Sequence, residues 1–327
     1  MIVALALSPS VDVTYLVDEL TRGGITRPTR IVRVPGGKAL NAARVAKALG
    51  ATVHVIAALG GATGAWIRDA LHEEGITCTT TELREATRSC ISVVETGTDS
   101  PVSTDIYELA SAFAADEWAA FCGSVHQAVT PGSIVAICGS TPDGVPLDEL
   151  AALLAGLRAA GSTIVVDSSG IGLRAMIGSA DLVKINITEA AEILTVQPTD
   201  ALDACRLLRQ RFAVDAVVTD GIKGASASVA GVECVVAGPR QLGRFPAGSG
   251  DAFLGGLVTG LARGDSLVDS LALAADAGER NALVAGQARL GESTRRVAVP
   301  PFRRVAGETS TNQAAKPQAS ATLRGRG

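Results

Sequence analysis

The feature that most limits the fold is a regular alternation of strand and helix patterns in the second half of the chain. Short segments rich in β-branched residues recur at 133–140, 162–169, 180–186 and 213–221. Helical patterns at 147–161, 189–194 and 201–212 separate them. Such alternation is typical of βαβ units and predicts an α/β fold around a mainly parallel sheet, whose ligands bind at the carboxyl ends of the strands.

The first half of the chain is less regular. A first strand is predicted within residues 1–13, a helix over 36–50 that ends at Gly50, and a strand followed by a helix over 52–75. About residues 10–34 and 88–107 the pattern changes to pairs of short, partly alternating strands. These pairs predict a second, smaller sheet beside the central one.

Length and composition allow one large α/β domain or two small ones. The 327 residues are 47% hydrophobic but only 3% aromatic, so the core must be built from Ala, Val, Leu and Ile. Residues 307–327 are polar and lack periodicity. We therefore expect one folded domain over residues 1–306, followed by a disordered tail.

Charge and cysteine usage argue against several classes of protein. The formal net charge of −4 provides no broad basic field for a nucleic acid. No apolar run is long enough for a membrane span, and the N-terminal segment lacks the basic region of a secretory signal. The six cysteines form no C-x-x-C pair, which favours reduced thiols in a cytoplasmic protein over a zinc site or a disulfide framework.

One acid stands out in residues 245–261, FPAGSGDAFLGGLVTGL, where Gly248, Ser249 and Gly250 precede Asp251. The simplest explanation is helix capping, because Asp is common at N-caps and in first turns. The alternative is catalytic: amides at a helix N-terminus stabilise a transferring phosphoryl group while a carboxylate takes the proton from an acceptor hydroxyl. The spacing fits neither a dinucleotide fingerprint nor a Walker A motif.

Several motifs together resemble the ribokinase/PfkB sugar-kinase family, in its 1-phosphofructokinase-like branch. Residues 247–266 are similar to the family's C-terminal signature, and PGGKALNAARVAKALG, residues 35–50, to its N-terminal glycine-rich signature. The resemblance extends over roughly residues 2–300 and implies a three-layer α/β/α fold with a small β-sheet lid. It also implies an ATP- and Mg²⁺-dependent sugar kinase. Further matches follow in the family's order: LSPSVDVTY, ICGSTPDGVP, VVDSSGIGL, LVKINITEAAEIL and VVTDGIKGAS.

The resemblance implies roles for individual residues. Asp251 matches the family's catalytic base, and the glycine turn before it the anion hole. Asn186 and Glu189 match positions that contact Mg²⁺ largely through water, although the same two residues would also make an ordinary capping box. The other implied positions are Asp12, Gly36, Gly37, Lys38 and Asn41 for the acceptor, and Lys184, Thr219, Gly221, Gly224 and Asn281 for the nucleotide.

Arg27 and Arg88 match positions where phosphosugar kinases of this family place basic residues. A guanidinium suits a phosphate, although either arginine alone could be a solvated surface residue. With Lys38, the pair favours an acceptor that already carries a phosphate. The lid of such kinases excludes water and often forms a dimer interface, so a homodimer through the lid is expected.

Three departures from the family pattern concern the acceptor site. Ser8 stands where Asn is usual, Ala39 replaces a Gly, and Tyr107 puts a phenol where a small amide would lie. The leading hypothesis is a kinase for fructose 1-phosphate, fructose 6-phosphate or tagatose 6-phosphate. Two alternatives stay open, namely a kinase for a cyclitol or cyclitol phosphate in specialised metabolism and a non-catalytic sugar-phosphate sensor.

Overall fold

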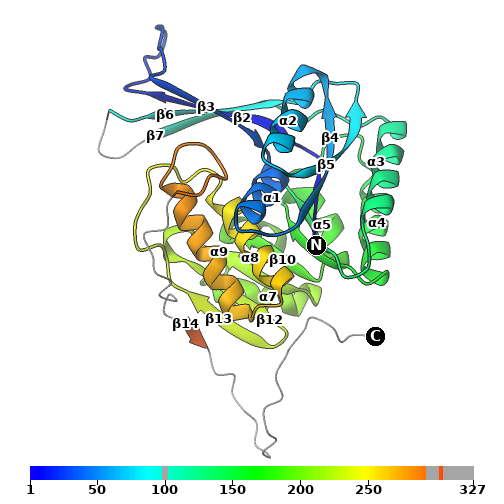
Figure 1. Ribbon diagram of the computed structural model, residues 1–327. Helices are drawn as coiled ribbons and strands as arrows, with labels where there is room; N and C mark the ends of the chain where they lie inside the picture. Colours follow the sequence, from blue (N-terminus) through cyan, green and yellow to red (C-terminus); the bar gives the residue numbers. More distant parts are fainter. Residues whose placement is uncertain (98–101, 292–301, 305–327) are drawn as a thin grey trace, which may run out of the picture.

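The computed structural model describes residues 1–97, 102–291 and 302–304, so the tail predicted over 307–327 lies outside it. Its centre is a ten-stranded sheet in the order β14-β13-β12-β11-β10-β9-β8-β1-β4-β5 (Figure 1). Neighbouring strands from β5 to β11 pair in parallel, and the described strands beyond β11 pair antiparallel. The parallel strands are β1 (Ile2–Ala6), β4 (Val53–Gly60), β5 (Thr77–Leu83), β8 (Ile134–Cys138), β9 (Thr163–Asp167), β10 (Leu182–Asn186) and β11 (Asp215–Thr219).

Helices cover both faces of the sheet, which confirms the predicted three-layer α/β/α fold. Strand β1 shows the cause: Val3 and Leu5 point into one apolar cluster, while Ile2 and Ala4 point into the other. The first cluster includes residues of α3 (Ala115–Ala128), α4 (Leu147–Ala159), α5 (Gly170–Met176), α6 (Ile187–Leu194) and α7 (Ala201–Phe212). The second includes residues of α1 (Lys38–Ala48), α2 (Gly61–Glu73), α8 (Ser249–Arg263) and α9 (Leu267–Ala282).

The predicted smaller sheet is present and stands beside the main body (Figure 1). Its order is β3-β2-β6-β7, built from β3 (Arg30–Gly36), β2 (Ser10–Val17), β6 (Ser89–Glu95) and β7 (Val102–Tyr107). Val32 and Val34 of β3 pack in one apolar cluster with Ala285, and Phe245 lies against that cluster. The small sheet therefore rests on loops that flank α8 and α9.

Several elements were missed by the sequence analysis. Helices α3 and α5 and the edge strand β5 were not predicted. A further omission is the hairpin of β12 (Ala225–Val229) and β13 (Val232–Val236), which joins β14 (Phe302–Arg304) at the other edge of the sheet. The hairpin turns at Ala230 and Gly231, both with positive φ, as a two-residue type I′ turn requires. Alanine rarely adopts such a φ, so the turn has no strong signal in the sequence.

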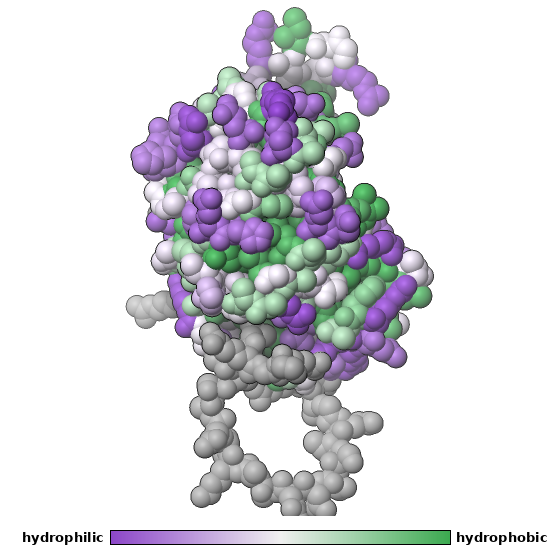
Figure 2. Space-filling view, turned by 90° about the vertical axis from the view of Figure 1, so that its right-hand side faces the viewer, coloured by the Kyte–Doolittle hydropathy of each residue, from purple (hydrophilic) through white to green (hydrophobic). Residues whose placement is uncertain are grey.

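Surface and thiol chemistry agree with a globular protein. Figure 2 shows the face on the right-hand side of Figure 1, where hydrophilic side chains are interspersed with hydrophobic ones. The six cysteines, all within the described residues, form no disulfide with one another, and four of them are buried. Within the residues that the structure describes, none of the helices has the length and apolar character needed to cross a membrane.

Candidate active site

The carboxyl ends of adjacent parallel strands bring polar side chains to one edge of the central sheet. Asp167 is the last residue of β9, and Lys184 and Asn186 lie in β10 beside it. Thr219, at the end of β11, pairs in register with Asn186. The edge predicted to bind ligands is thus lined by an acid, a lysine and an amide.

Asp167 holds two lysines from different layers. Its Oδ2 accepts a hydrogen bond from Lys184 Nζ at 2.6 Å, and its Oδ1 accepts one from Lys38 Nζ at 3.0 Å. Lys38 opens α1 and also pairs with Glu189 Oε1 at 3.2 Å. Burial alone would raise the pKa of Asp167, but Lys184 and Lys38 outweigh it and hold that pKa below its usual range. The result is a fixed cluster in which two lysines bind the buried Asp167 carboxylate, while the partly exposed Lys38 also pairs with Glu189.

Asp251 lies next to this cluster, in the first turn of α8, and its side chain is buried. Its Oδ2 accepts a hydrogen bond from Asn41 Nδ2 at 2.9 Å. Burial, and then the charge of Asp167, raise the pKa of Asp251 to about 6, although Lys38 opposes them. A carboxylate with this pKa is ionised at neutral pH and still has appreciable affinity for a proton, which suits a general base.

The turn before α8 presents main-chain amides beside that carboxylate. Gly248 has a φ of 80° and is the N-cap of the helix; a side chain there would be strained and would meet the side chain of Gln287. The Ser249 amide donates to the Pro246 carbonyl at 3.1 Å, so it is already paired. The amides of Gly250 and Asp251 precede the first bond within the helix, and they are the ones that can face an anion.

Lys184 adds a positive charge to this turn. A Cβ built on Gly250 would stand 3.3 Å from Lys184 Nζ, so the ammonium lies directly beside the helix N-terminus. The predicted anion hole of Gly248, Ser249 and Gly250 is therefore modified by the structure: its donors centre on Gly250, Asp251 and Lys184. Backbone dipole and side-chain charge act on the same small volume.

The predicted acceptor side is built around Asp12 in β2. A Cβ on Gly36 would stand 1.9 Å from the Asp12 carboxyl carbon, so only glycine fits beneath that carboxylate. Ser10 Oγ donates to Asp12 Oδ1 at 2.6 Å, and the Gly37 amide approaches Oδ2 at 3.4 Å. Burial raises the pKa of Asp12. Gly37 itself has a φ of 87° and begins α1, which carries Lys38 and Asn41.

The two predicted arginines take different positions. Arg88 donates to the main-chain oxygens of Ser8 and Glu108, both at 3.1 Å, and its buried Nε has no partner among the described residues. Arg88 therefore has a donor available close to Asp12. Arg27 is exposed in the loop between β2 and β3, and no contact joins it to the cluster among the described residues. That loop projects from the small sheet away from the main body (Figure 1). The hairpin is long enough to carry residue 27 beyond the site.

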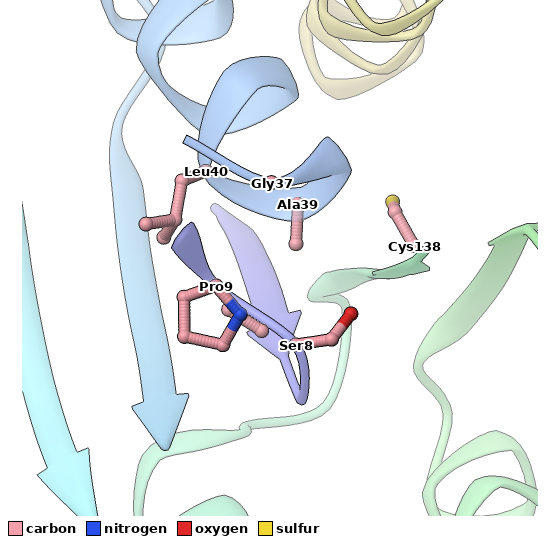
Figure 3. A pocket seen from close by; sticks show the side chains of 7 residues that line it. Ser8, Pro9, Gly37, Ala39, Leu40 and Cys138 are labelled. Atoms are coloured by element: carbon pink, nitrogen blue, oxygen red, sulfur yellow. The ribbon is translucent and has the colours of Figure 1, made fainter. Parts of the chain in front are cut away.

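The three departures from the family pattern all lie on the acceptor side. Asp12, Cys90 and Tyr107 stand in register across β2, β6 and β7, so Tyr107 shares a sheet face with Asp12. Ser8 and Ala39 point toward a small pocket with Cys138 (Figure 3). This pocket is too tight for a water molecule, and it is also lined by Ala6, Pro9, Gly37 and Leu40. The methyl group of Ala39 occupies space that a glycine would leave open.

The predicted nucleotide side consists mainly of turns. Gly221 and Gly224 have φ of 52° and 102°, and a Cβ on Gly224 would stand 2.0 Å from the Val236 carbonyl oxygen. Asn281 of α9 is fully buried: its Nδ2 donates to the Ala247 carbonyl and to Ser249 Oγ. It stands behind the turn that begins α8, and contact with a nucleotide would require these bonds to break.

Asn186 and Glu189 form the capping box that the sequence also allowed. Asn186 Oδ1 accepts from the Glu189 amide, and Glu189 Oε2 accepts from the Asn186 amide, both at 2.9 Å. Over residues 1–97, 102–291 and 302–304, no group of three or more His, Cys, Asp and Glu side chains could hold a metal ion. Asn186 and Glu189 alone provide few ligands, so a metal here would need further oxygen ligands from water or a substrate.

Two residues in the site were not singled out from the sequence. Asp167 was part of a matched segment without a role, although an acid that ends a buried strand in a parallel sheet is a usable signal. Gln287 Oε1 accepts from Asn41 Nδ2 at 3.3 Å, and nothing local in the sequence indicates this contact.

Comparison with known proteins gives one family and a set of similar folds. Residues 1–290 match the family described as pfkB family carbohydrate kinase. Phosphofructokinase-2 from Escherichia coli, solved with substrates and products, is 28% identical with a TM-score of 0.82, over 89% of this chain and 95% of that chain. Its tetrameric inhibited form is 28% identical with a TM-score of 0.80, over 86% and 94%. A Thermotoga maritima protein described as a possible 1-phosphofructokinase is 19% identical with a TM-score of 0.74, over 94% and 100%.

Proposed function

The chain belongs to the pfkB family of carbohydrate kinases, and from this premise we propose that it transfers a phosphoryl group from ATP to a hydroxyl of a phosphohexose, with Asp251 as the general base. The observation that carries the proposal is the position of the buried Asp251 carboxylate. It stands at the N-terminus of α8, between Asn41 and the Lys38–Asp167–Lys184 cluster. A proton acceptor thus lies beside main-chain amides and lysine side chains that can bind an anion.

In the proposed mechanism, each residue acts on charge or position. Asp251 takes the proton from the acceptor hydroxyl while the oxygen of that hydroxyl attacks the γ-phosphorus of ATP. The amides of Gly250 and Asp251, with Lys184, stabilise the charge on the transferring phosphoryl group. Asp167 fixes Lys184 and Lys38 on either side of it, so the positive charges are in place before the substrates bind. The bond from oxygen to the γ-phosphorus forms while the bond to ADP breaks.

Kinases of this family generally use Mg²⁺, and the oxygen donors of this site fit such an ion. Asn186 and Glu189 provide an amide and a carboxylate beside Lys184, without a protein cage. Mg²⁺ retains several waters and binds mainly through substrate phosphates, so few protein ligands are needed. When bound, the ion would neutralise phosphate charge, with Asn186 and Glu189 holding it largely through water.

The acceptor is proposed to carry a phosphate already. Arg88 supports this, because it has an unpartnered buried donor near Asp12 at the edge of the small sheet. The candidates are fructose 1-phosphate, fructose 6-phosphate and tagatose 6-phosphate. A cyclitol or cyclitol phosphate is the second candidate, since Ala39 and Tyr107 alter the acceptor wall.

The small sheet is proposed to act as a lid and as the interface of a homodimer. One face packs through Val32 and Val34 toward Phe245 and Ala285, over the acceptor side. The opposite face packs Val11, Val13 and Tyr15 on the second apolar cluster of the main body, and it leaves Ile31 43% and Ile106 61% exposed. A second copy would cover the exposed part of this face.

An acceptor panel tests the proposed function. With ATP and Mg²⁺, ADP formation is measured for the three phosphohexoses, for fructose and tagatose, and for a cyclitol with its phosphate. We expect turnover with at least one phosphohexose and much weaker turnover with its unphosphorylated analogue. Turnover confined to the cyclitols would support the second candidate. No ATP consumption with any acceptor, together with a melting temperature raised by a sugar phosphate, would establish a sensor and reject the kinase.

A further inference from the structure

The side-chain amide of Asn41 is shared between two acceptors. Its Nδ2 donates to Asp251 Oδ2 at 2.9 Å and to Gln287 Oε1 at 3.3 Å. A primary amide has two N–H groups, so each contact uses one of them. Asn41 is 1% exposed, and its Oδ1 has no hydrogen-bond partner in the described part of the chain. The Asn41 amide also acts on the buried Asp12 carboxylate, where it lowers the pKa of that acid. The amide nitrogen therefore faces three acceptors, Asp251, Gln287 and Asp12, which together determine how the amide is oriented.

Gln287 is the uncharged one of these acceptors, and it adds to the preference for this orientation. If the Asn41 amide were flipped, its Oδ1 would face both the Asp251 carboxylate and the Gln287 carbonyl, and three acceptors would meet without a proton. With Gln287 in place, both N–H groups of Asn41 have acceptors. One of them is then directed at Asp251 in every state of the site.

Gln287 is itself held from three sides. Its main-chain oxygen accepts from Arg44 Nη1 at 3.2 Å, and Arg44 is buried in an ion pair with Glu74 at 2.7 Å. Its Cβ lies 3.0 Å from the position that a Cβ of Gly248 would take. The preceding Gly286 has a φ of 95° and packs so closely on Val32 of the small sheet that a Cβ would stand 2.7 Å from it. These contacts fix the turn at Gly286 and Gln287, and they hold the Gln287 side-chain amide next to Asn41.

We infer that Gln287 is a positioning residue for the proposed base: it orients the Asn41 amide so that one N–H bonds the Asp251 carboxylate. The inference rests on the proposed function of Asp251. Its consequence is chemical, because a hydrogen bond to the ionised carboxylate favours ionisation. Loss of the Gln287 acceptor would weaken that bond and make Asp251 retain its proton to a higher pH.

Other groups that face Asp251 would remain in place. They are Lys38 from α1, the Cys138 thiol from β8, Asp167 from β9 and Lys184 from β10. None of them is bonded to Gln287 in the described residues. A change confined to Gln287 therefore separates the effect of the Asn41 hydrogen bond from that of the charged cluster.

The test is the pH profile of kcat/KM for Gln287→Met, which removes the acceptor and keeps the length of the side chain. We expect the acid limb to move up by about 0.5–1 pH unit, the size of effect that one weakened hydrogen bond to a carboxylate produces. At pH 6 this makes kcat/KM of the variant about two- to fivefold lower than that of the wild type at the same pH, while the alkaline plateau should change less than about twofold. Gln127→Met, the same replacement at an exposed position of α3, is the matched control and should leave the profile unchanged.

Two further variants make the outcome decisive. In an Asn41→Leu background, Gln287→Met should produce no additional shift, because the group through which it acts is gone. Gln287→Leu also removes the acceptor, so it should move the limb in the same direction; it serves if the Met variant does not fold.

Three results distinguish the two proposals. An unshifted acid limb in both Gln287 variants, or a uniform loss at every pH, would overturn the positioning role. A shift that persists in the Asn41→Leu background would overturn it too. Wild-type turnover by Asp251→Asn would instead reject the proposed base, and with it the premise of the inference.

Discussion

Asp251 is an ionisable side chain at a position where the surrounding protein disfavours its charge. Burial and the neighbouring Asp167 raise its pKa to about 6 from a usual value of 3.8. A group whose pKa is raised in the folded state stabilises the fold while it is protonated, and that contribution is lost as the pH rises through about 6. The ionised form that a general base requires is therefore also the less stable one.

The first prediction concerns the stability that is lost when Asp251 ionises in the folded protein. Asp251→Asn should raise the free energy of unfolding at pH 8 by about 2–3 kcal/mol, since one pKa unit corresponds to about 1.4 kcal/mol. Near pH 4 the variant and the wild type should be nearly equally stable. Denaturant unfolding at both pH values measures the difference, with the exposed Asp69→Asn as the matched control. A variant that is less stable than the wild type at pH 8 would show that the carboxylate is needed by the fold.

The second prediction at the scale of single residues concerns Arg88. If its unpartnered Nε binds the phosphate of the acceptor, Arg88→Ala should raise KM for the phosphohexose by about 10-fold or more, the effect of a lost charge-assisted hydrogen bond. KM for the unphosphorylated sugar should change much less. Steady-state kinetics with the matched pair of acceptors measures both. Equal increases in KM would mean that Arg88 does not hold a phosphate.

Among the elements, α6 shows how one capping box can serve two purposes. Asn186 and Glu189 satisfy each other's main-chain amides, and Glu189 also holds Lys38. The side chains that cap the helix are thus the same ones that are proposed to bind Mg²⁺. Replacement by a different capping residue separates them, because serine caps a helix as well as asparagine does.

The third prediction follows. Asn186→Ala should lower the free energy of unfolding by about 1 kcal/mol, and Asn186→Ser by much less. Both variants should require a higher Mg²⁺ concentration for half-maximal turnover, because a serine hydroxyl is shorter than an amide. Unfolding curves and Mg²⁺ titrations of activity provide the two measurements. If Asn186→Ser behaved like the wild type at every Mg²⁺ concentration, Asn186 would be a cap alone.

Helices and strands were predictable where a local pattern determines them. The βαβ alternation, α1 and the four strands of the small sheet follow from periodicity and from glycine at the ends of elements. The β12–β13 hairpin was missed because its Ala230–Gly231 turn lacks the usual Asn or Asp. The contact of Gln287 with Asn41 joins residues 246 positions apart, so it depends on tertiary packing rather than on any local pattern. The position of Arg27 away from the cluster depends in the same way on how far the hairpin extends.

In the molecule as a whole, the small sheet lies between the proposed acceptor site and an exposed part of the surface. One face bears Asp12 and contacts the loops around Phe245 and Ala285, whereas the exposed part of the other face bears Ile31 and Ile106. An interface on that exposed part would hold the sheet as a unit over the acceptor. Assembly and acceptor binding would then depend on the same element.

The fourth prediction tests this coupling. By light scattering, the wild type should have the mass of two copies or a multiple of it, and Ile106→Asp should shift toward one copy, because a buried charge opposes an apolar interface. Val196→Asp, at a position 51% exposed outside the small sheet, is the control and should not change the mass. A wild type that is monomeric, or an Ile106 variant that keeps its mass, would reject the lid as the interface.

The most direct test of the central claim is the turnover of Asp251→Asn with the best acceptor, measured on folded protein between pH 5 and pH 9. We predict a kcat at least about 100-fold below that of the wild type across this range, the lower end for loss of a general base. The wild type should lose kcat/KM below a pH of about 6 as one proton binds. Turnover by Asp251→Asn within a few-fold of the wild type would contradict the account, because the proton of the acceptor would then be removed by some other group.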